Sequence, residues 1–312
     1  MRIGILEGDH FSARARTMLA NIGPVEVFDG GMLEAFLADK EVLFVRLGYR
    51  IDRATLDLAP RLKLLCSPTT GHNHLDEVHL SLRGIELISL RGERTFLQCI
   101  RATPEHTLGL MLALLRNYRI AFLDSNHPYW DRDRCRGDEL FGMRVGIIGL
   151  GRVGGIVAEY LRALGARVAY VDIRPEVSRD GCERCGSLAA LIEASELVVM
   201  CASYADGQPP VMDRELVGLL AGRYFVNTAR GELVDEAALL ELVRQESMKG
   251  VATDVIANEN GPNRLDEWLD AATGRNVIVT PHIAGATWSS MAATEEFIAQ
   301  KLMKKLEQAA TR

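Results

Sequence analysis

The sequence has few aromatic residues, no long apolar run and no excess of positive charge. Aromatic residues make up 6% of its 312 residues, and no stretch approaches the ~20 consecutive apolar residues that cross a bilayer. The net charge of -6 and the pI near 5.7 disfavour a broad nucleic-acid surface, which needs clustered positive charge. The segment Met1–Glu7 reaches charged residues at once and lacks the apolar core of a signal peptide. We therefore expect a globular, cytoplasmic protein that binds neither membrane nor nucleic acid.

Cysteine is sparse, and its spacing does not form a metal site. Two of the six cysteines, Cys66 and Cys201, lie in apolar runs, where a reduced thiol behaves as a small hydrophobic group. Cys182 and Cys185 form one CxxC, but a zinc site needs a second pair or nearby histidines at ligand spacing. We expect reduced thiols and a surface loop at the CxxC, with a metal or redox centre as the alternative.

Short apolar segments alternate with amphipathic ones along the first hundred residues. The chain is long enough for two domains, since one domain takes roughly 100–200 residues. Helical patterns at Ser12–Asn21 and Met32–Ala38 separate the first strands, which indicates βαβ crossovers and a parallel sheet. The strand-like segments are Arg2–Leu6, Val25–Phe28, Val42–Val45, Leu62–Cys66 and Glu86–Ser89.

A strongly apolar helix is expected next. Thr103 is a suitable N-cap, Pro104 suits the first helical position, and Glu105 favours the positive end of the helix. The leucine-rich face of His106–Tyr118 is too apolar for a surface helix. The pattern predicts a buried helix.

A second series of apolar segments follows Leu140. Six strands with helices between them predict one doubly wound parallel sheet. These segments are Arg144–Ile148, Arg167–Val171, Leu197–Cys201, Tyr224–Asn227, Gly250–Asp254 and Val277–Thr280.

A glycine-rich turn follows the first strand of this second series. Gly149 allows the tight turn, Gly151 lets the backbone approach a pyrophosphate, and Gly154 lets helix and strand pack closely. The amphipathic helix Val153–Leu164 begins at this turn, so that its free N–H groups and dipole face the phosphate charge. Strand, glycines and helix together predict a dinucleotide site.

The next strand ends in Asp172, eighteen residues beyond Gly154. A carboxylate at this position hydrogen-bonds the adenosine ribose hydroxyls and repels a 2′-phosphate, which favours NAD over NADP. Arg174 could weaken that preference.

Three further segments, Asn227–Glu236, Ala252–Glu259 and Thr280–Thr287, each follow a strand of this sheet. The carboxyl ends of the strands are where doubly wound folds bind ligands. With the glycine-rich turn, these segments closely resemble the D-isomer-specific 2-hydroxyacid dehydrogenases, the family of phosphoglycerate, glycerate and D-lactate dehydrogenases. The resemblance extends over nearly the whole chain.

The resemblance implies a catalytic trio of Arg230, Glu259 and His282 for the reversible reduction of a small 2-oxo acid. An arginine offers a planar fork of donors to the substrate carboxylate and carbonyl oxygen. A protonated histidine can give its proton to the forming alkoxide. A glutamate beside it orients the ring and favours the imidazolium.

The resemblance also implies the α/β architecture and the domain roles. A Rossmann-type NAD-binding domain of residues 101–284 is inserted in a flavodoxin-like substrate domain of residues 1–100 plus 285–312. A polar arm around Trp130 implies a homodimer. Besides Gly149, Gly151, Gly154 and Asp172, the implied cofactor contacts are Arg152, Val153, Ser203, Thr228, Ala229, Asp254, Ala284 and Gly285. The implied substrate contacts are Arg46, Thr69, Thr70 and Gly71.

Several positions depart from the family pattern. Thr69 stands where the family usually has glycine, and Asn73 where it has aspartate. His72 and His74 are unusual neighbours that could suggest a metal, although a third ligand is missing. Ser203 lies in a segment that replaces the common His-x-Pro. These departures limit the substrate assignment.

Arginines are frequent in the expected substrate half. The loop Arg91–Arg101 is longer than usual by about four residues, and longer loops often carry function. With Arg46, the arginines Arg91, Arg94 and Arg101 suggest a substrate with a second anionic group. The alternative is a set of solvated charges.

Two other functions remain open from the sequence. A dinucleotide-sensing regulator on the same fold would bind the cofactor without turnover. A phosphite-type dehydrogenase would oxidise a non-carbon centre.

Overall fold

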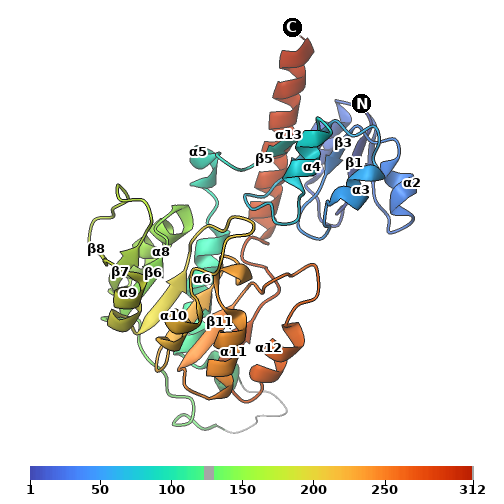
Figure 1. Ribbon diagram of the computed structural model, residues 1–312. Helices are drawn as coiled ribbons and strands as arrows, with labels where there is room; N and C mark the ends of the chain where they lie inside the picture. The colour runs from blue at the N-terminus through green and yellow to red at the C-terminus, as the bar shows by residue number, and fades with distance from the viewer. Residues whose placement is uncertain (123–129, 311–312) are drawn as a thin grey trace. The chain divides into compact units, whose positions relative to one another are not determined.

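The computed structural model describes residues 1–122 and 130–310. The chain divides into two compact units, each containing one parallel sheet (Figure 1). The first unit joins Met1–Ile100 to Ala286–Arg312, and the second is Arg101–Gly285. No helix in the described part of the chain is long and apolar enough to cross a membrane.

The sheet of the first unit has the order β2-β1-β3-β4-β5, with all pairs parallel. This is the flavodoxin-like order, and it confirms the α/β class expected for this half. The strands are β1 Ile3–Ile5, β2 Val25–Val27, β3 Val42–Phe44, β4 Leu64–Ser67 and β5 Glu86–Ser89. The helices are α1 Ala13–Ala20, α2 Leu33–Leu37, α3 Arg53–Asp57, α4 Glu77–Leu82, α5 Arg94–Leu97 and α13 Trp288–Ala310.

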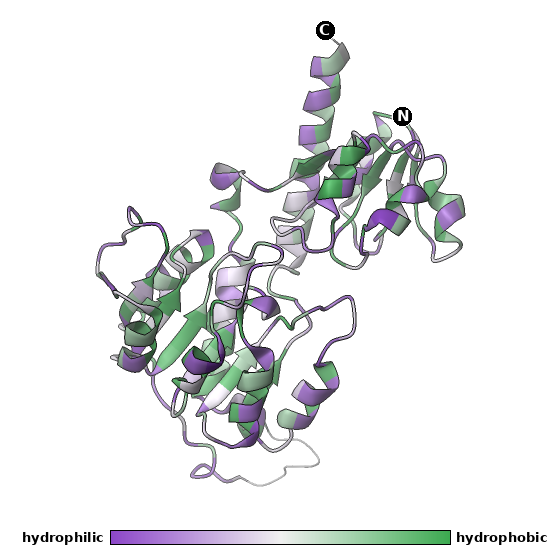
Figure 2. Cartoon of the chain, viewed as in Figure 1, coloured by the Kyte–Doolittle hydropathy of each residue, from purple (hydrophilic) through white to green (hydrophobic). Residues whose placement is uncertain are grey.

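The last helix of the chain completes the core of the first unit. Ile298, Ala299 and Leu302 of α13 are fully buried against residues of β1, β3 and α1. Figure 2 shows mixed hydropathy along α13, as expected for a helix with one buried face. The first unit is therefore built from the two ends of the chain.

The sheet of the second unit has the order β12-β11-β10-β9-β6-β7-β8, again all parallel. The chain adds β7 and β8 on one side of β6 and then β9 to β12 on its other side, so the order of strand addition reverses between β6 and β9. This is the doubly wound Rossmann arrangement. The strands are β6 Arg144–Ile148, β7 Arg167–Val171, β8 Cys182–Arg184, β9 Leu197–Met200, β10 Tyr224–Asn227, β11 Gly250–Thr253 and β12 Val277–Val279. Figure 2 shows hydrophobic colour along most of these strands, as expected for a sheet covered on both faces.

The seventh strand, β8, corrects the sequence prediction of six strands and a loop at the CxxC. Its residues Cys182–Arg184 are polar and partly exposed at the sheet edge, so they lack the apolar run by which the other strands were found. Cys182 packs against one core cluster and Cys185 against the other. The two thiols thus face opposite sides of the sheet. Within the described residues no group of three or more His, Cys, Asp or Glu side chains is arranged to hold a metal ion.

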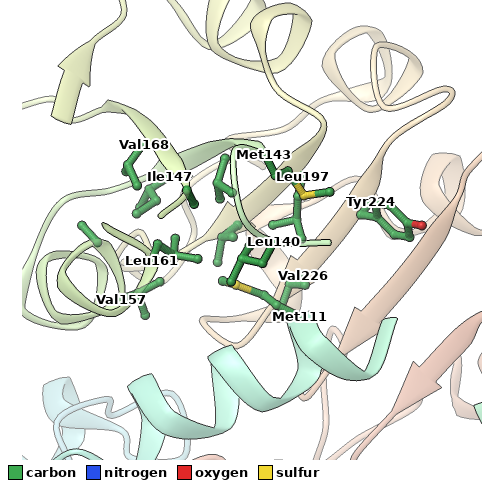
Figure 3. Packing of buried hydrophobic residues seen from close by; sticks show 14 of the residues in the cluster. Met111, Leu140, Met143, Ile147, Val157, Leu161, Val168, Leu197, Tyr224 and Val226 are labelled. Atoms are coloured by element: carbon green, nitrogen blue, oxygen red, sulfur yellow. The ribbon is translucent and has the colours of Figure 1, made fainter. Parts of the chain in front are cut away.

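Helices cover both faces of this sheet. Residues of α6 and α8 pack on one face, where Met111, Val157 and Leu161 meet Ile147 and Val226 (Figure 3). Residues of α9 to α12 form the cluster on the other face. The helices are α6 Ala102–Leu115, α7 Tyr118–Ala121, α8 Arg152–Ala163, α9 Leu188–Ala194, α10 Arg214–Gly218, α11 Glu236–Arg244 and α12 Leu265–Ala271, with a 3-10 turn η1 at Gly231–Leu233.

The buried helix α6 is present, but its expected start was wrong. It begins at Ala102 with Arg101 as the N-cap, and Thr103 is already helical, with its carbonyl accepting from the Thr107 hydroxyl. Pro104 fits because the first N–H groups of a helix have no intrahelical partner. The proline therefore did not fix the starting residue.

Candidate functional site

The turn between β6 and α8 has no room for side chains at two of its glycines. Gly149 has a φ of +91°, and a Cβ there would lie 2.7 Å from the backbone of Ala202. A Cβ at Gly154 would lie 2.1 Å from the carbonyl oxygen of Gly149. These glycines let the helix begin directly against the strand.

Gly151 differs from the other two glycines because the space beside it is open. Among the described residues, and apart from the adjoining backbone, the only atom within 4 Å of a Cβ built there is Nη2 of Arg174, at 3.9 Å. Gly151 is the N-cap of the twelve-residue helix α8, and Arg152 and Val153 are its first two residues. Burial, with the nearby charge of Arg101, lowers the pKa of Arg152. An open backbone, a helix N-terminus and a desolvated guanidinium fit a pyrophosphate.

Asp172, at the end of β7, is occupied by protein donors. It accepts from the backbone N–H of Leu150 at 2.8 Å and from Arg174 through three hydrogen bonds of 2.9 Å. The hydrogen bonds from Arg174 lower the pKa of Asp172 to about 2. The carboxylate stands beside the glycine turn as expected, but it is already paired.

Asp254, just after β11, holds the turn that carries His282. Its buried carboxylate accepts from the Thr280 hydroxyl at 2.6 Å and from the N–H groups of Ile283 and Ala284 at 2.9 and 2.8 Å. Nε2 of His106 lies 3.4 Å from it. Burial raises the pKa of Asp254, but these hydrogen bonds outweigh that effect and lower it.

His282 and Glu259 lie together, although they follow different strands. The distance from His282 Nδ1 to Glu259 Oε2 is 2.6 Å. A carboxylate accepts the Nδ1 proton, so Nε2 is the ring nitrogen left to exchange a proton. The φ of His282 is +52°, a left-handed conformation that an L-residue adopts only where its surroundings enforce it. Its backbone N–H donates to the carbonyls of Asp254 and Thr280.

The segment before Glu259 is held by two other glutamates. Glu236 Oε1 accepts from the Ala257 N–H at 3.2 Å and from the Trp268 indole at 2.8 Å. Glu232 accepts from the Asn258 N–H at 3.0 Å. Burial raises the pKa of Glu236. The two carboxylates fix the backbone from which Glu259 reaches the histidine.

Arg230, Thr228 and Ala229 follow β10. The Asn227 side chain donates to the Arg230 carbonyl and accepts from the Ala229 N–H, which shapes the turn. The Thr228 hydroxyl pairs with that of Thr107 on α6 at 2.7 Å, and Arg230 Nη1 donates to the Ala229 carbonyl. The turn thus lies at the same edge of the sheet as the segments carrying Glu259 and His282.

The remaining expected cofactor residues follow β9 and β12. Ser203 is exposed, three residues after β9. Ala284 is buried, and Gly285 is the exposed last residue of the second unit.

In the first unit, Arg46 is tied into the protein. Its Nη2 donates to the carbonyls of Glu7 and Asp9, and its Nη1 lies 3.6 Å from the fully buried Glu295 of α13. The Glu7 carboxylate accepts from the Arg46 N–H. These contacts hold the end of β3 against β1 and α13, and they compete with any substrate contact.

The loop after β4 contains the other expected substrate residues. The Thr69 hydroxyl pairs with Ser67 at 2.8 Å and donates to the Gly71 carbonyl at 3.0 Å, while Thr70 is exposed. The buried His72 lies 3.1 Å from Glu77, which also pairs with Arg91 at 3.0 Å. Glu77 therefore connects this loop to the arginine-rich one.

His106, Thr107, Glu232 and Glu236 were not found by sequence reasoning. They contact the site's turns from α6, η1 and α11, and their sequence neighbourhoods carry no signal of such contacts. The only available hint was the position of Glu232 and Glu236 within the segment that resembles the family.

The second unit thus combines a doubly wound sheet, a glycine-rich turn and the Glu259–His282 pair. The sequence model of the D-isomer specific 2-hydroxyacid dehydrogenase, NAD binding domain, matches residues 108–284. The chain belongs to this family, and its second unit contains the family's NAD-binding domain.

Individual relatives are similar over most of the chain. D-3-phosphoglycerate dehydrogenase of Methanocaldococcus jannaschii is 30% identical over 97% of this chain and 57% of its own length. Glyoxylate reductase of Thermofilum pendens is 29% identical over 87% of this chain and 80% of its own. The chain spans about half the length of the first curated relatives that it matches.

A solved structure shows the same fold. D-lactate dehydrogenase of Aquifex aeolicus, complexed with NAD and lactic acid, superposes with a TM-score of 0.84 at 23% identity, covering 99% of this chain and 96% of that one. At this identity the likeness shows the fold alone.

Proposed function

We propose that this protein is an NAD-dependent D-2-hydroxyacid dehydrogenase that reversibly reduces a small 2-oxo acid. The observation that carries the proposal is the 2.6 Å contact between His282 and Glu259, set on a turn that Asp254 holds. Neither residue would be placed this way for packing alone, because both side chains remain partly exposed. Membership of the family supports the same reaction.

The bound nicotinamide would supply the hydride, and the protein residues manage the substrate's charge and proton. Arg230 binds the carboxylate and polarises the carbonyl with its planar fork of donors. His282 gives a proton from Nε2 to the oxygen that becomes an alkoxide, and takes it back in the reverse direction. Glu259 keeps the Nδ1 proton in place and favours the imidazolium.

For the cofactor, the turn Gly149–Gly154 and α8 hold the pyrophosphate, and Asp172 faces the adenosine ribose. Thr228, Ala229 and Asp254 border the nicotinamide. For the substrate, we assign Thr69, Thr70 and Gly71 to its carboxylate, with Arg46 nearby. The open Gly151 and exposed Thr70 support these roles.

We propose that the substrate carries a second anionic group, and three of the four arginines considered for it already have acidic partners. Arg91 pairs with Glu77, Arg46 lies near Glu295, and Arg101 belongs to the second unit, where it pairs with Glu159. Arg94, at the start of α5, is exposed. A phosphate or second carboxylate would therefore have to compete with these pairs or use Arg94.

The test is NADH consumption with glyoxylate, hydroxypyruvate, pyruvate, oxaloacetate and phosphonopyruvate. We expect turnover with at least one acid and a loss of about 10²–10⁴-fold in kcat for His282→Ala, because general acid–base catalysis contributes that much. NADH binding should persist. His79→Ala is the control, since His79 pairs with Asp57 on the surface of the first unit, and it should retain full turnover.

This experiment, together with an assay of NADH formation from NAD⁺ with phosphite and with 2-hydroxy acids, separates the rival functions. NADH binding without turnover on any acid would favour a dinucleotide-sensing regulator. NADH formation with phosphite, and none with hydroxy acids, would favour a phosphite-type dehydrogenase.

We also propose a cytoplasmic homodimer that uses the arm around Trp130. Trp130 is 91% exposed, although residues 123–129 of the arm lie outside the described residues. The six cysteines are free thiols, which suits a reducing compartment. Light scattering on the purified protein would measure the mass, and a monomer would contradict the dimer.

A further inference from the structure

The carboxylate expected to bind the adenosine ribose is engaged by a guanidinium. Nε and the backbone N–H of Arg174 donate to Asp172 Oδ1, and Nη2 donates to Oδ2, each at 2.9 Å. The Asp172 side chain is 5% exposed, whereas that of Arg174 is 45% exposed. The ribose hydroxyls can reach the Asp172 carboxylate only if the exposed Arg174 side chain moves away from it.

Arg174 lies where a dinucleotide would pass. Its Nη2 is the atom closest to a Cβ built at Gly151, the open position of the glycine turn. The Arg174 guanidinium therefore lies between the expected pyrophosphate position and Asp172, the carboxylate expected to bind the adenosine ribose. A planar guanidinium matches phosphate oxygens in a bidentate manner.

The backbone below Arg174 is fixed, so only its side chain has to turn. Arg184 of β8 donates to the carbonyls of Asp172, Arg174, Pro175 and Val177. Its guanidinium also lies 5.6 Å from the centre of the Tyr170 ring. Arg184 thereby holds the loop in place.

Other arginines surround the first turns of α8. Arg179 Nη1 lies 3.4 Å from a Cβ built at Gly155, and both Arg179 and Arg101 pair with Glu159. Arg152 is the first residue of the helix. An additional phosphate would enter an environment with several cations, which favours anions.

We propose that Arg174 makes this site a binding site for the 2′-phosphate of NADP(H) as well as for NAD(H). With NAD(H), the guanidinium swings out and Asp172 accepts the ribose hydroxyls. With NADP(H), Arg174 leaves Asp172 for the phosphate and reduces the repulsion between the two anions. The proposal extends the cofactor range of the NAD-binding domain and does not depend on the identity of the substrate.

The test is a pair of calorimetric titrations, with NADH and with NADPH, on the full-length chain without substrate. We expect the wild type to bind both dinucleotides, with a dissociation constant for NADPH within about 100-fold of that for NADH, because the charge of one arginine offsets that of one carboxylate. Arg174→Ala should weaken NADPH at least about 10-fold, the size of a lost charged contact, and leave NADH unchanged or tighter. NADPH binding should also lose part of its salt dependence.

Arg144→Ala is the control, because it removes an exposed arginine at the amino end of β6, where it pairs with Glu196 and is not part of the glycine turn. It should change the two affinities by similar factors. Asp172→Asn is a second variant that should weaken NADH and not NADPH. Thermal melting confirms that each variant is folded.

Two outcomes would overturn the proposal: no NADPH binding by a wild type that binds NADH, or equal effects of Arg174→Ala on both dinucleotides. Failure of the wild type to bind NADH would instead overturn the cofactor role as a whole. If both affinities are as expected but the protein reduces no 2-oxo acid, the proposed reaction would be wrong and the cofactor proposal would stand.

Discussion

At the scale of single residues, the glycines of the turn are needed for different physical reasons. Gly154 is required for packing, because any Cβ there would meet a backbone oxygen. Gly151 has an ordinary φ of -74° and open space beside it, so the fold itself does not require it. The space at Gly151 serves a ligand.

We therefore predict that alanine separates stability from binding at these two positions. Gly154→Ala should lower the free energy of unfolding by about 1–3 kcal/mol, the usual cost of overpacking. Gly151→Ala should leave the melting temperature nearly unchanged and weaken NADH at least about 10-fold, because its methyl group occupies the space that backbone approach to the pyrophosphate needs. Equal binding by Gly151→Ala and wild type would place the pyrophosphate elsewhere.

At the scale of elements, the catalytic side chains depend on contacts between segments that follow different strands. Glu259 lies in a turn after β11, but its backbone is held by Glu236 of α11 and by Glu232 of η1. Gly231 makes the approach possible, since a Cβ there would lie 2.0 Å from Ile256. These elements act as a frame around the Glu259–His282 pair.

Glu236 gives a pH-dependent prediction. Because burial raises its pKa above the unfolded value, the native state binds this proton more tightly than the unfolded state. The stability from the protonated form is present at low pH and is lost as pH rises through the raised pKa. Glu236→Gln keeps an oxygen for Trp268 and Ala257 without the buried charge, so it should be more stable than wild type at pH 8, by about 1 kcal/mol. The advantage should shrink toward pH 5.

Melting curves at the two pH values measure this difference, and Glu236→Ala is the comparison. The alanine variant loses both hydrogen bonds, so it should melt lower than wild type and show reduced kcat through a loosened Glu259. A glutamine variant that is equally destabilised at both pH values would contradict the role of the buried charge.

At the scale of the whole molecule, the chain leaves the first unit at Ile100 and returns at Ala286. The second unit is continuous in sequence and has its own two core clusters. The first unit depends on α13, whose buried face completes the cluster around β1 and β3. The two units should therefore respond separately to core mutations.

We predict that Leu302→Ala destabilises the first unit by about 2–5 kcal/mol, the range for a leucine truncated in a core. NADH binding, measured by titration at 25 °C, should be retained because the cofactor turn belongs to the second unit. The exposed Leu269 of α12 is a control whose replacement by alanine should cost little. Loss of NADH binding in Leu302→Ala would show that the second unit requires an intact first unit.

The sequence by itself determined the two α/β sheets and the glycine-rich turn, because apolar periodicity and glycine spacing are local properties of the chain. The strands in apolar runs were predicted within two residues at each end. The polar edge strand β8 was missed, and the first residue of α6 was misplaced, since Pro104 fits several positions in the first turn.

The tertiary structure decided which of the expected site residues are available and which are held. The contacts of Arg46 with Glu7 and Glu295, and the support of the Glu259 segment by Glu236, join side chains to partners on other elements. Such contacts depend on how folded elements approach one another and on the directions of their side chains. No spacing along the chain encodes them.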